Sequence, residues 1–237
     1  MINFIKKLFQ NNNSTTNKHI NVDKSISDKN DKIQSLLTDA VQLKKEKRFD
    51  EACTLLKESY KLAGDDLSIV ARLRLPMYLQ LANKNDEGWS DITNLNVLYL
   101  DAYSQMCINK QMRIFLSKEK KFMNAIPFGI YSYCKEIEYN LDMFDKKQEE
   151  IKSDDYKDII ENMDKETLKG FDGTYFFERA SQLREYDSIS IMISPLLKKA
   201  KLDGRTKNFT DLIYNYIFES RRFNYLDVDK ICKSNLL

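Results

Sequence analysis

The sequence predicts an all-α protein, a solenoid of antiparallel helix hairpins with a C-terminal helical cap. Three observations support this prediction. The 237 residues include only 6 Gly and 3 Pro, too few for the frequent tight turns of an all-β fold. From about residue 31, apolar residues recur at steps of three and four, the period of an amphipathic helix. A short segment also returns along the chain at a nearly constant spacing, which is typical of repeat proteins.

The composition excludes several classes of protein. Apolar residues make up 42% of the chain and charged residues 31%, which favours a folded core over wholesale disorder. A net charge of +2 gives no general attraction to nucleic acid, so we expect no nucleic-acid partner. No apolar run approaches the ~18 residues of a membrane span. Because the cysteines are scattered and no secretory signal is recognisable, we expect a cytoplasmic protein.

A repeated segment defines the first two helices. The string KEKRFDEA at residues 45–52 returns as KEKKFMNA at 118–125, which is 118 − 45 = 73 residues later. Between them, residues 85–88 follow residues 49–52 by 36 positions. We expect a helix on each side of Lys47-Arg48, and the second of these should end at Gly64. A weaker copy at residues 185–189 predicts a helix that runs through Leu196 and ends at Gly204.

These hairpins resemble the tetratricopeptide repeat, in which helix pairs of about 34 residues stack into a superhelix. Residues 33–64 match best, and residues 69–100 and 106–139 match more loosely. The matching positions are the small Ala40, the large Leu43, Phe49 and Leu56, and the alanine position, held by Ala52, Gly88 and Ala125. Two residues depart from the pattern: Gly64 replaces the usual closing proline, and Pro76 must kink or restart the helix in which it lies.

The composition changes along the chain predict four segments. Residues 1–30 form a flexible N-terminal segment, whose apolar and basic residues 1–9 either contact a membrane surface or pack back on the protein. The TPR-like repeats occupy residues 31–140. An acidic helical connector follows at 141–170, since residues 141–166 hold ten Asp and Glu against five Lys. Residues 171–237 form a helical hairpin and cap, and their many aromatic residues offer an alternative contact surface for a partner.

The resemblance implies where a partner binds. In the family, the first helix of each pair lines the concave face, which is the usual ligand surface. The corresponding positions form a groove that is apolar with a basic edge, suited to an amphipathic helix or peptide. An alternative is that the chain's own termini fill this groove. The predicted groove residues are Leu37, Val41, Lys44, Lys45, Leu73, Met77, Gln80, Lys110, Ile114 and Ser117.

No motif in the sequence predicts catalysis. The single histidine, His19, lies in a polar stretch, so we find no catalytic triad and no histidine-based metal site. We expect no cofactor, no metal and no enzymatic activity. The sequence therefore predicts a non-catalytic protein–protein interaction module, an adaptor or regulator, that binds a protein or peptide partner. The alternative is a bacterial or phage immunity or antitoxin-like protein that inactivates one partner; the sequence predicts neither the partner's identity nor the oligomeric state.

Overall fold

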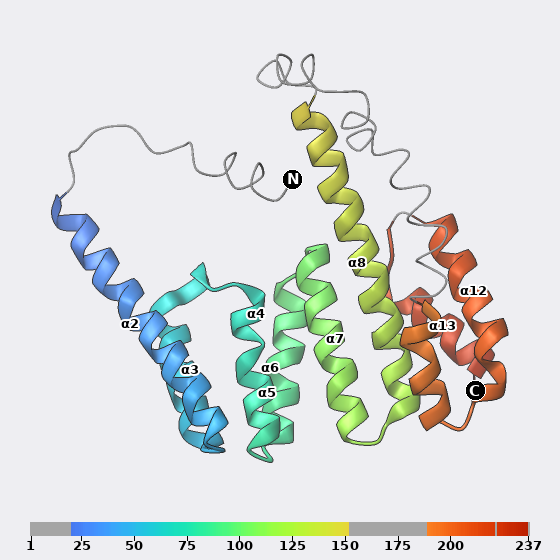
Figure 1. The fold of residues 1–237 in the computed structure, drawn as a ribbon, viewed down its shortest axis with the longest axis horizontal. Helices are drawn as coiled ribbons and strands as arrows, with labels where there is room; N and C mark the ends of the chain where they lie inside the picture. Colours follow the sequence, from blue (N-terminus) through green and yellow to red (C-terminus); the bar gives the residue numbers. More distant parts are fainter. Residues whose placement is uncertain (1–19, 152–188, 221, 237) are drawn as a thin grey trace. The chain divides into compact units, whose positions relative to one another are not determined.

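The computed structural model describes residues 20–151, 189–220 and 222–236 (Figure 1). Every regular element in these ranges is helical and none is a strand, which confirms the predicted all-α class. The chain divides into two compact units, Met1–Leu67 and Ser68–Leu237, and we describe each by itself. The predicted membrane contact of residues 1–9 and most of the predicted acidic connector lie outside the described residues.

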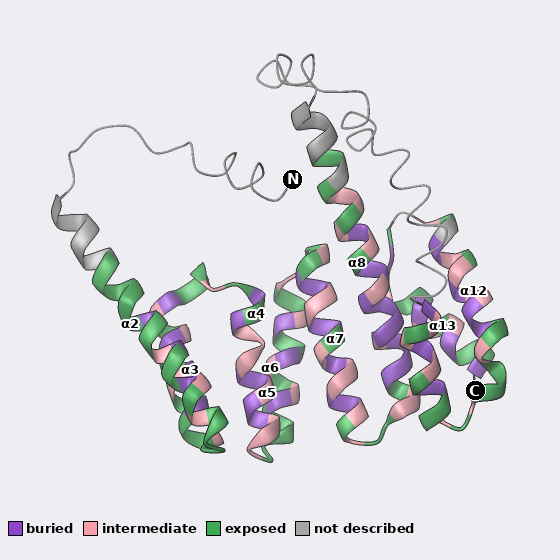
Figure 2. Ribbon diagram, viewed as in Figure 1, coloured by how far each residue is buried: buried purple, intermediate pink, exposed green. Residues whose placement is uncertain are grey.

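The first unit contains one helix hairpin. Helix α2 (Ile20–Lys45) packs against α3 (Phe49–Ala63), and a 3₁₀ turn, η1 (Gly64–Asp66), follows. Gly64 has a φ of 61°, a left-handed conformation that glycine adopts without steric cost, and α3 ends at the residue before it as predicted. One face of each helix is buried (Figure 2), and the buried residues are Ile33, Leu37, Ala40, Ala52, Cys53, Leu56, Ser59 and Ala63.

The second unit begins with a short helix and two hairpins. Helix α4 (Ile69–Arg72) leads into the pair α5 (Arg74–Leu81) and α6 (Asn85–Leu98), and then the pair α7 (Ala102–Lys118) and α8 (Phe122–Ile151). Helix α7 packs against α6 as well as α8. Their shared core is apolar and comprises Ile69, Ile92, Leu95, Ile108, Met112 and Phe115. Helix α8 continues without a break past residue 140, where the repeats were predicted to end.

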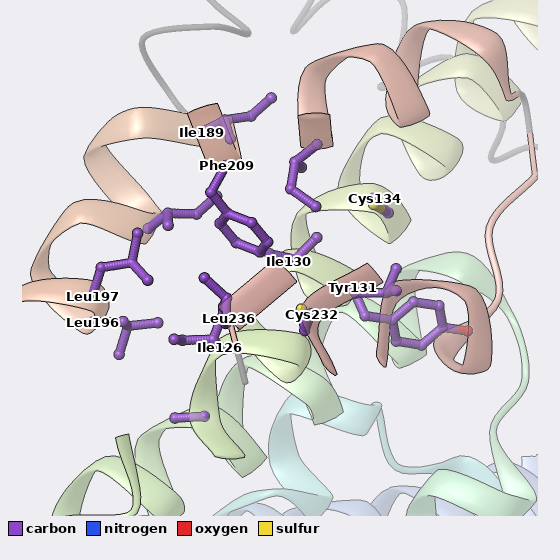
Figure 3. Packing of buried hydrophobic residues seen from close by; sticks show 14 of the residues in the cluster. Ile126, Ile130, Tyr131, Cys134, Ile189, Leu196, Leu197, Phe209, Cys232 and Leu236 are labelled. Carbon is purple, nitrogen blue, oxygen red and sulfur yellow. The ribbon is translucent and has the colours of Figure 1, made fainter. Parts of the chain in front are cut away.

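The C-terminal helices share a core with α8. They comprise a helix at residues 189–199, a 3₁₀ turn η2 (Asp203–Arg205), α12 (Thr206–Glu219) and α13 (Tyr225–Leu236). Figure 3 shows Ile126 and Ile130 of α8 beside Phe209 and Leu236. An ion-pair network adds to this contact, because Arg222 lies 3.1 Å from Glu138 and 2.8 Å from Asp142, and Glu138 also pairs with the buried Lys135. The loop between α12 and α13 is thereby fixed to α8.

One turn geometry recurs at four places in the chain. Lys47, Asn83, Lys120 and Lys201 each follow a helix and have φ between 60° and 62°. In each turn the next amide donates to the carbonyl of a leucine five residues earlier, at 2.8–2.9 Å: the pairs are Arg48–Leu43, Lys84–Leu79, Lys121–Leu116 and Leu202–Leu197. This is the Schellman arrangement that closes helix C-termini. The first three turns are followed by helices that start at Phe49, Asn85 and Phe122, which confirms the predicted spacings of 36 and 37 residues.

The fourth turn corrects one prediction. The helix at residues 189–199 ends through the left-handed Lys201, whereas Gly204 lies beyond it in η2. The expected end at Gly204 is therefore wrong, because a lysine takes the left-handed conformation that closes this helix, three residues before the glycine. This turn stands where the turns after α2, α5 and α7 stand. The helix at 189–199 is followed by η2 and then by α12.

Pro76 interrupts its helix as predicted. The helical segment from Ile69 to Leu81 breaks at Leu73, which separates α4 from α5. Proline has no amide hydrogen to donate to the carbonyl four residues before it, and that carbonyl belongs to Arg72, the last residue of α4. Helix α5 therefore restarts just before the proline, whose ring is accommodated in its first turn.

Candidate partner-binding groove

Helix α7 presents one face to the core and another to a groove. Its start is fixed by Asp101, whose Oδ1 accepts a hydrogen bond from the Ser104 amide at 2.9 Å, as an N-cap residue does. Ile108, Met112 and Phe115 are buried against the neighbouring helices. The opposite side carries the groove residues of this helix, which are Arg113, Ile114, Ser117 and Lys118.

The second wall of the groove is the helix at residues 189–199. Ile189, Ile193 and Leu197 are fully buried in the C-terminal core and hold this helix against α8 and α12. Its other side is apolar as well, and Ile191 is 73% exposed. The groove residues of this wall are Ile191, Met192, Pro195, Leu196 and Lys199, and the whole groove encloses about 380 Å³.

A glycine of α8 lies where the two walls meet. A Cβ atom on Gly129 would stand 2.9 Å from Cδ of Arg113 and 3.1 Å from Sδ of Met192. Both distances are shorter than ordinary van der Waals contact, so the absent side chain is what allows the two walls to approach. Arg113 and Met192 therefore pack over the same small area of α8 and form the floor of the groove together.

The charged residues that line the groove are all positive among those that the structure describes. Arg113 and Lys118 belong to α7, and Lys199 belongs to the facing helix. The Lys199 ammonium lies 5.5 Å from the ring centroid of Phe122 at the start of α8, a cation–π distance. Within the described part of the chain, none of these three cations forms an ion pair with a carboxylate.

The structure brings two predicted groove residues together. Ile114 and Ser117 line the groove, and Lys110 is exposed one helical turn before Ile114 on α7. Leu73, Met77 and Gln80 lie half-buried before and within α5. Gln80 is close to α7, because its Nε2 lies 3.5 Å from the Phe115 carbonyl oxygen.

The four predicted residues of the first unit lie on α2. Lys44 and Lys45 are exposed in its last turn, and Val41 is half-buried. Leu37 is 6% exposed and belongs to the buried face of the hairpin. A residue so deeply buried has no surface left for a ligand, so we leave Leu37 out of the candidate site.

Several groove residues escaped the sequence analysis. Arg113 and Lys118 adjoin predicted positions on α7, and a count of all residues on that helix face would have found them. Residues 189–199 lie in the segment 171–237 that the sequence predicts to be the cap. The weak copy at residues 185–189 stands before this helix, where the stronger copies stand before the second helix of a pair, so the helix was not predicted to line the groove. The missed residues are Arg113, Lys118, Ile191, Met192, Pro195, Leu196 and Lys199.

A second hollow lies between α8 and α13. It encloses about 470 Å³ and is lined by Met123, Pro127, Phe128 and Tyr225, among others. Its charged residues, Asp229 and Lys233, pair with each other at 2.6 Å. Burial raises the pKa of Cys232, also in its wall, to about 12, so this thiol stays protonated at neutral pH and is a poor nucleophile.

Comparison of the chain with protein-family models, with curated proteins and with solved structures finds no match. In residues 20–151, 189–220 and 222–236, no three His, Cys, Asp or Glu side chains gather as ligands of a metal ion. No helix of these ranges is both long enough and apolar enough to cross a bilayer. Unlike the hollow between α8 and α13, whose Asp229 and Lys233 pair with each other, the groove between α7 and residues 189–199 combines apolar residues with three cations that have no carboxylate partner among the described residues.

Proposed function

We propose that this chain is a non-catalytic protein–protein interaction module, an adaptor or regulator, built as a TPR-like solenoid. The repeated Schellman turns support the solenoid, because they close successive helix hairpins with the same geometry. The offsets of 36 and 37 residues between the second helices support it too, since they are close to the length of a tetratricopeptide repeat.

The observation that carries the proposed function is the apolar groove between α7 and residues 189–199. By their turns, both helices are first helices of a pair, and in the tetratricopeptide family the first helices line the ligand face. Ile191, Met192 and Pro195 expose apolar surface there. A helix or extended peptide that places two or three apolar side chains in the groove would bury that surface.

The lining favours a peptide over a small metabolite. Small-molecule sites combine an apolar wall with several polar groups that converge on the ligand and fix its orientation. Among the described lining residues, Ser117 supplies the one uncharged polar side chain, and the three cations belong to flexible side chains. Long cationic side chains along an apolar strip suit a partner segment that continues beyond the groove at both ends.

The test is capture of a partner from extract of the native cell, read by mass spectrometry. We expect one stoichiometric protein partner with the full chain, and its loss with Ile114→Asp, which places a charge on the groove wall. Met77→Asp tests in the same way whether the ligand surface extends to α5. Val97→Asp is the matched control, because Val97 is 68% exposed on α6 and does not line the groove. A partner retained by Ile114→Asp would contradict the groove as its site.

A further inference from the structure

Three unpaired cations surround the apolar strip of the groove. Arg113 is half-buried on α7, Lys118 is exposed in the last turn of the same helix, and Lys199 is exposed on the facing helix. Each stands without a carboxylate partner among the described residues. Some other cations of this unit are paired: Lys121 with Glu119, Arg222 with Glu138 and Asp142, and Lys233 with Asp229. The groove is therefore a place where positive charge on both walls is left for a ligand.

We propose that the ligand of this groove is an acidic amphipathic helix of a partner protein. Its apolar residues lie on Ile114, Ile191 and Met192, and its carboxylates lie toward Arg113 and Lys118 on one side and Lys199 on the other. This inference rests on the proposed function, and it adds the charge of the partner. Complementary charge contributes mainly to the rate and the specificity of association, because like-charged partners are rejected.

A short helix can place apolar residues in the groove and carboxylates beside the cations of both walls. Apolar residues at steps of three and four form one stripe, and the residues that flank the stripe lie on both of its sides. Asp or Glu at these flanking positions reaches cations on both walls at once. An Arg–carboxylate pair is often bidentate and so fixes orientation as well, which assigns Arg113 the positioning part of the contact.

The lining distinguishes a protein partner from a nucleic acid. Sites for single-stranded nucleic acid combine cations with aromatic side chains on which the bases stack. Among the described residues no aromatic side chain lines this groove, and its apolar surface consists of aliphatic and thioether groups. Carboxylates that flank an apolar stripe fit such a lining, and phosphates that flank flat bases do not.

The experiment selects helical peptides from a randomised display library on the full-length chain. Enriched peptides are sequenced, and their affinities are measured by fluorescence anisotropy. We expect peptides with net negative charge and apolar residues at steps of three and four. The triple variant Arg113→Glu/Lys118→Glu/Lys199→Glu should weaken their binding by about tenfold or more, since it removes three ion pairs with the peptide and adds repulsion in their place. Binding should also weaken as salt rises from about 0.05 to 0.5 M.

Two further variants make the outcome decisive. Lys207→Glu is the matched control, because it reverses an exposed lysine on α12 outside the groove, and it should leave the affinity unchanged. Lys118→Glu alone replaces an exposed residue, so it keeps the test valid if the triple variant loses its helical circular dichroism. Neutral or basic peptides that depend on Ile114 would overturn the acidic partner and leave the proposed function standing. Peptides indifferent to Ile114→Asp, or no enrichment at all, would overturn both.

Discussion

The α5–α6 and α7–α8 hairpins have the same turn but different helix contacts. In both, the leucine carbonyl accepts from the amide five residues later, and the second helix starts two residues after the left-handed residue. The small residue near the start of the second helix differs, however. It is Gly88 in α6 and Ala125 in α8, and Ala125 is completely buried. The first helix also differs, because α5 contains Pro76 in its first turn and α7 is continuous.

These two differences are connected. A Cβ atom on Gly88 would lie 3.1 Å from the Pro76 carbonyl oxygen and 3.4 Å from Cε2 of Phe115. The backbone of the restarted α5 helix lies close to Gly88 of α6. At the equivalent position of α8, Ala125 has room for a methyl group. Pro76 in α5 and Gly88 in α6 are thus a compensated pair: the proline shifts the α5 backbone, and the glycine leaves room for it. The two departures from the repeat pattern have one cause.

The largest effect on the free energy of unfolding should follow from truncating the side chain that joins the two hairpins. Phe115 of α7 is fully buried, and its ring meets that of Trp89 on α6 edge-on at 5.4 Å. Phe115→Ala leaves a cavity on this contact, and we expect a loss of about 3–5 kcal/mol in the free energy of unfolding. Trp89 is the only tryptophan of the chain, so its fluorescence during urea unfolding measures this. A loss below about 1 kcal/mol would show that the hairpins do not depend on this contact.

Exchanging the small residues should have a smaller effect. Ala125→Gly removes a buried methyl and a good helix former, so we expect a loss of about 1–2 kcal/mol. Gly88→Ala adds a good helix former but presses its methyl on a backbone oxygen that cannot rotate away, and we expect a loss of about 1 kcal/mol. Urea unfolding of both variants tests the asymmetry. If Gly88→Ala instead stabilises the protein by the usual helix propensity, Pro76 and Gly88 are not a compensated pair.

The smallest effect on stability should come from substitutions in the turns at Asn83 and Lys120, and it should differ between the two turns. Lys120 and Asn83 occupy the same left-handed position, but asparagine tolerates this conformation better than lysine does. Lys120→Gly should therefore stabilise the protein by about 0.5–1 kcal/mol, and Asn83→Gly by a few tenths at most. Thermal unfolding followed by circular dichroism measures the difference. Lys120→Ala is the control, because alanine keeps the Cβ atom and should give no gain.

The turns could be predicted from the sequence because they are local. Phe49 and Phe122 follow nearly identical strings, and short-range hydrogen bonds alone determine the geometry around them. The all-α class and the break near Pro76 could be predicted for the same reason. The turn at Lys201 could not be predicted from a glycine signal, because lysine holds the left-handed position there, as it does at Lys47 and Lys120.

The groove could be predicted only on the α7 side. Ile114 and Ser117 follow from the position of α7 within its hairpin, which the repeat determines. The facing helix has apolar residues on most of its sides, since residues 189–197 read ISIMISPLL. Its polar residues Ser190, Ser194 and Lys198 form one narrow stripe, which does not tell which of the remaining apolar sides is covered. The 73% exposure of Ile191 therefore depends on tertiary contacts that the sequence pattern does not contain.

The recurrent turn has a consequence for how such hairpins can be recognised in other chains. Its four copies share a leucine and, four positions later, Lys or Asn, and they have no other residue type in common throughout. In this six-residue turn the residue type is therefore restricted at two positions and varies at the other four. Two proteins can therefore carry the same hairpin turn with almost no identical residues, so a low overall identity does not exclude a shared turn.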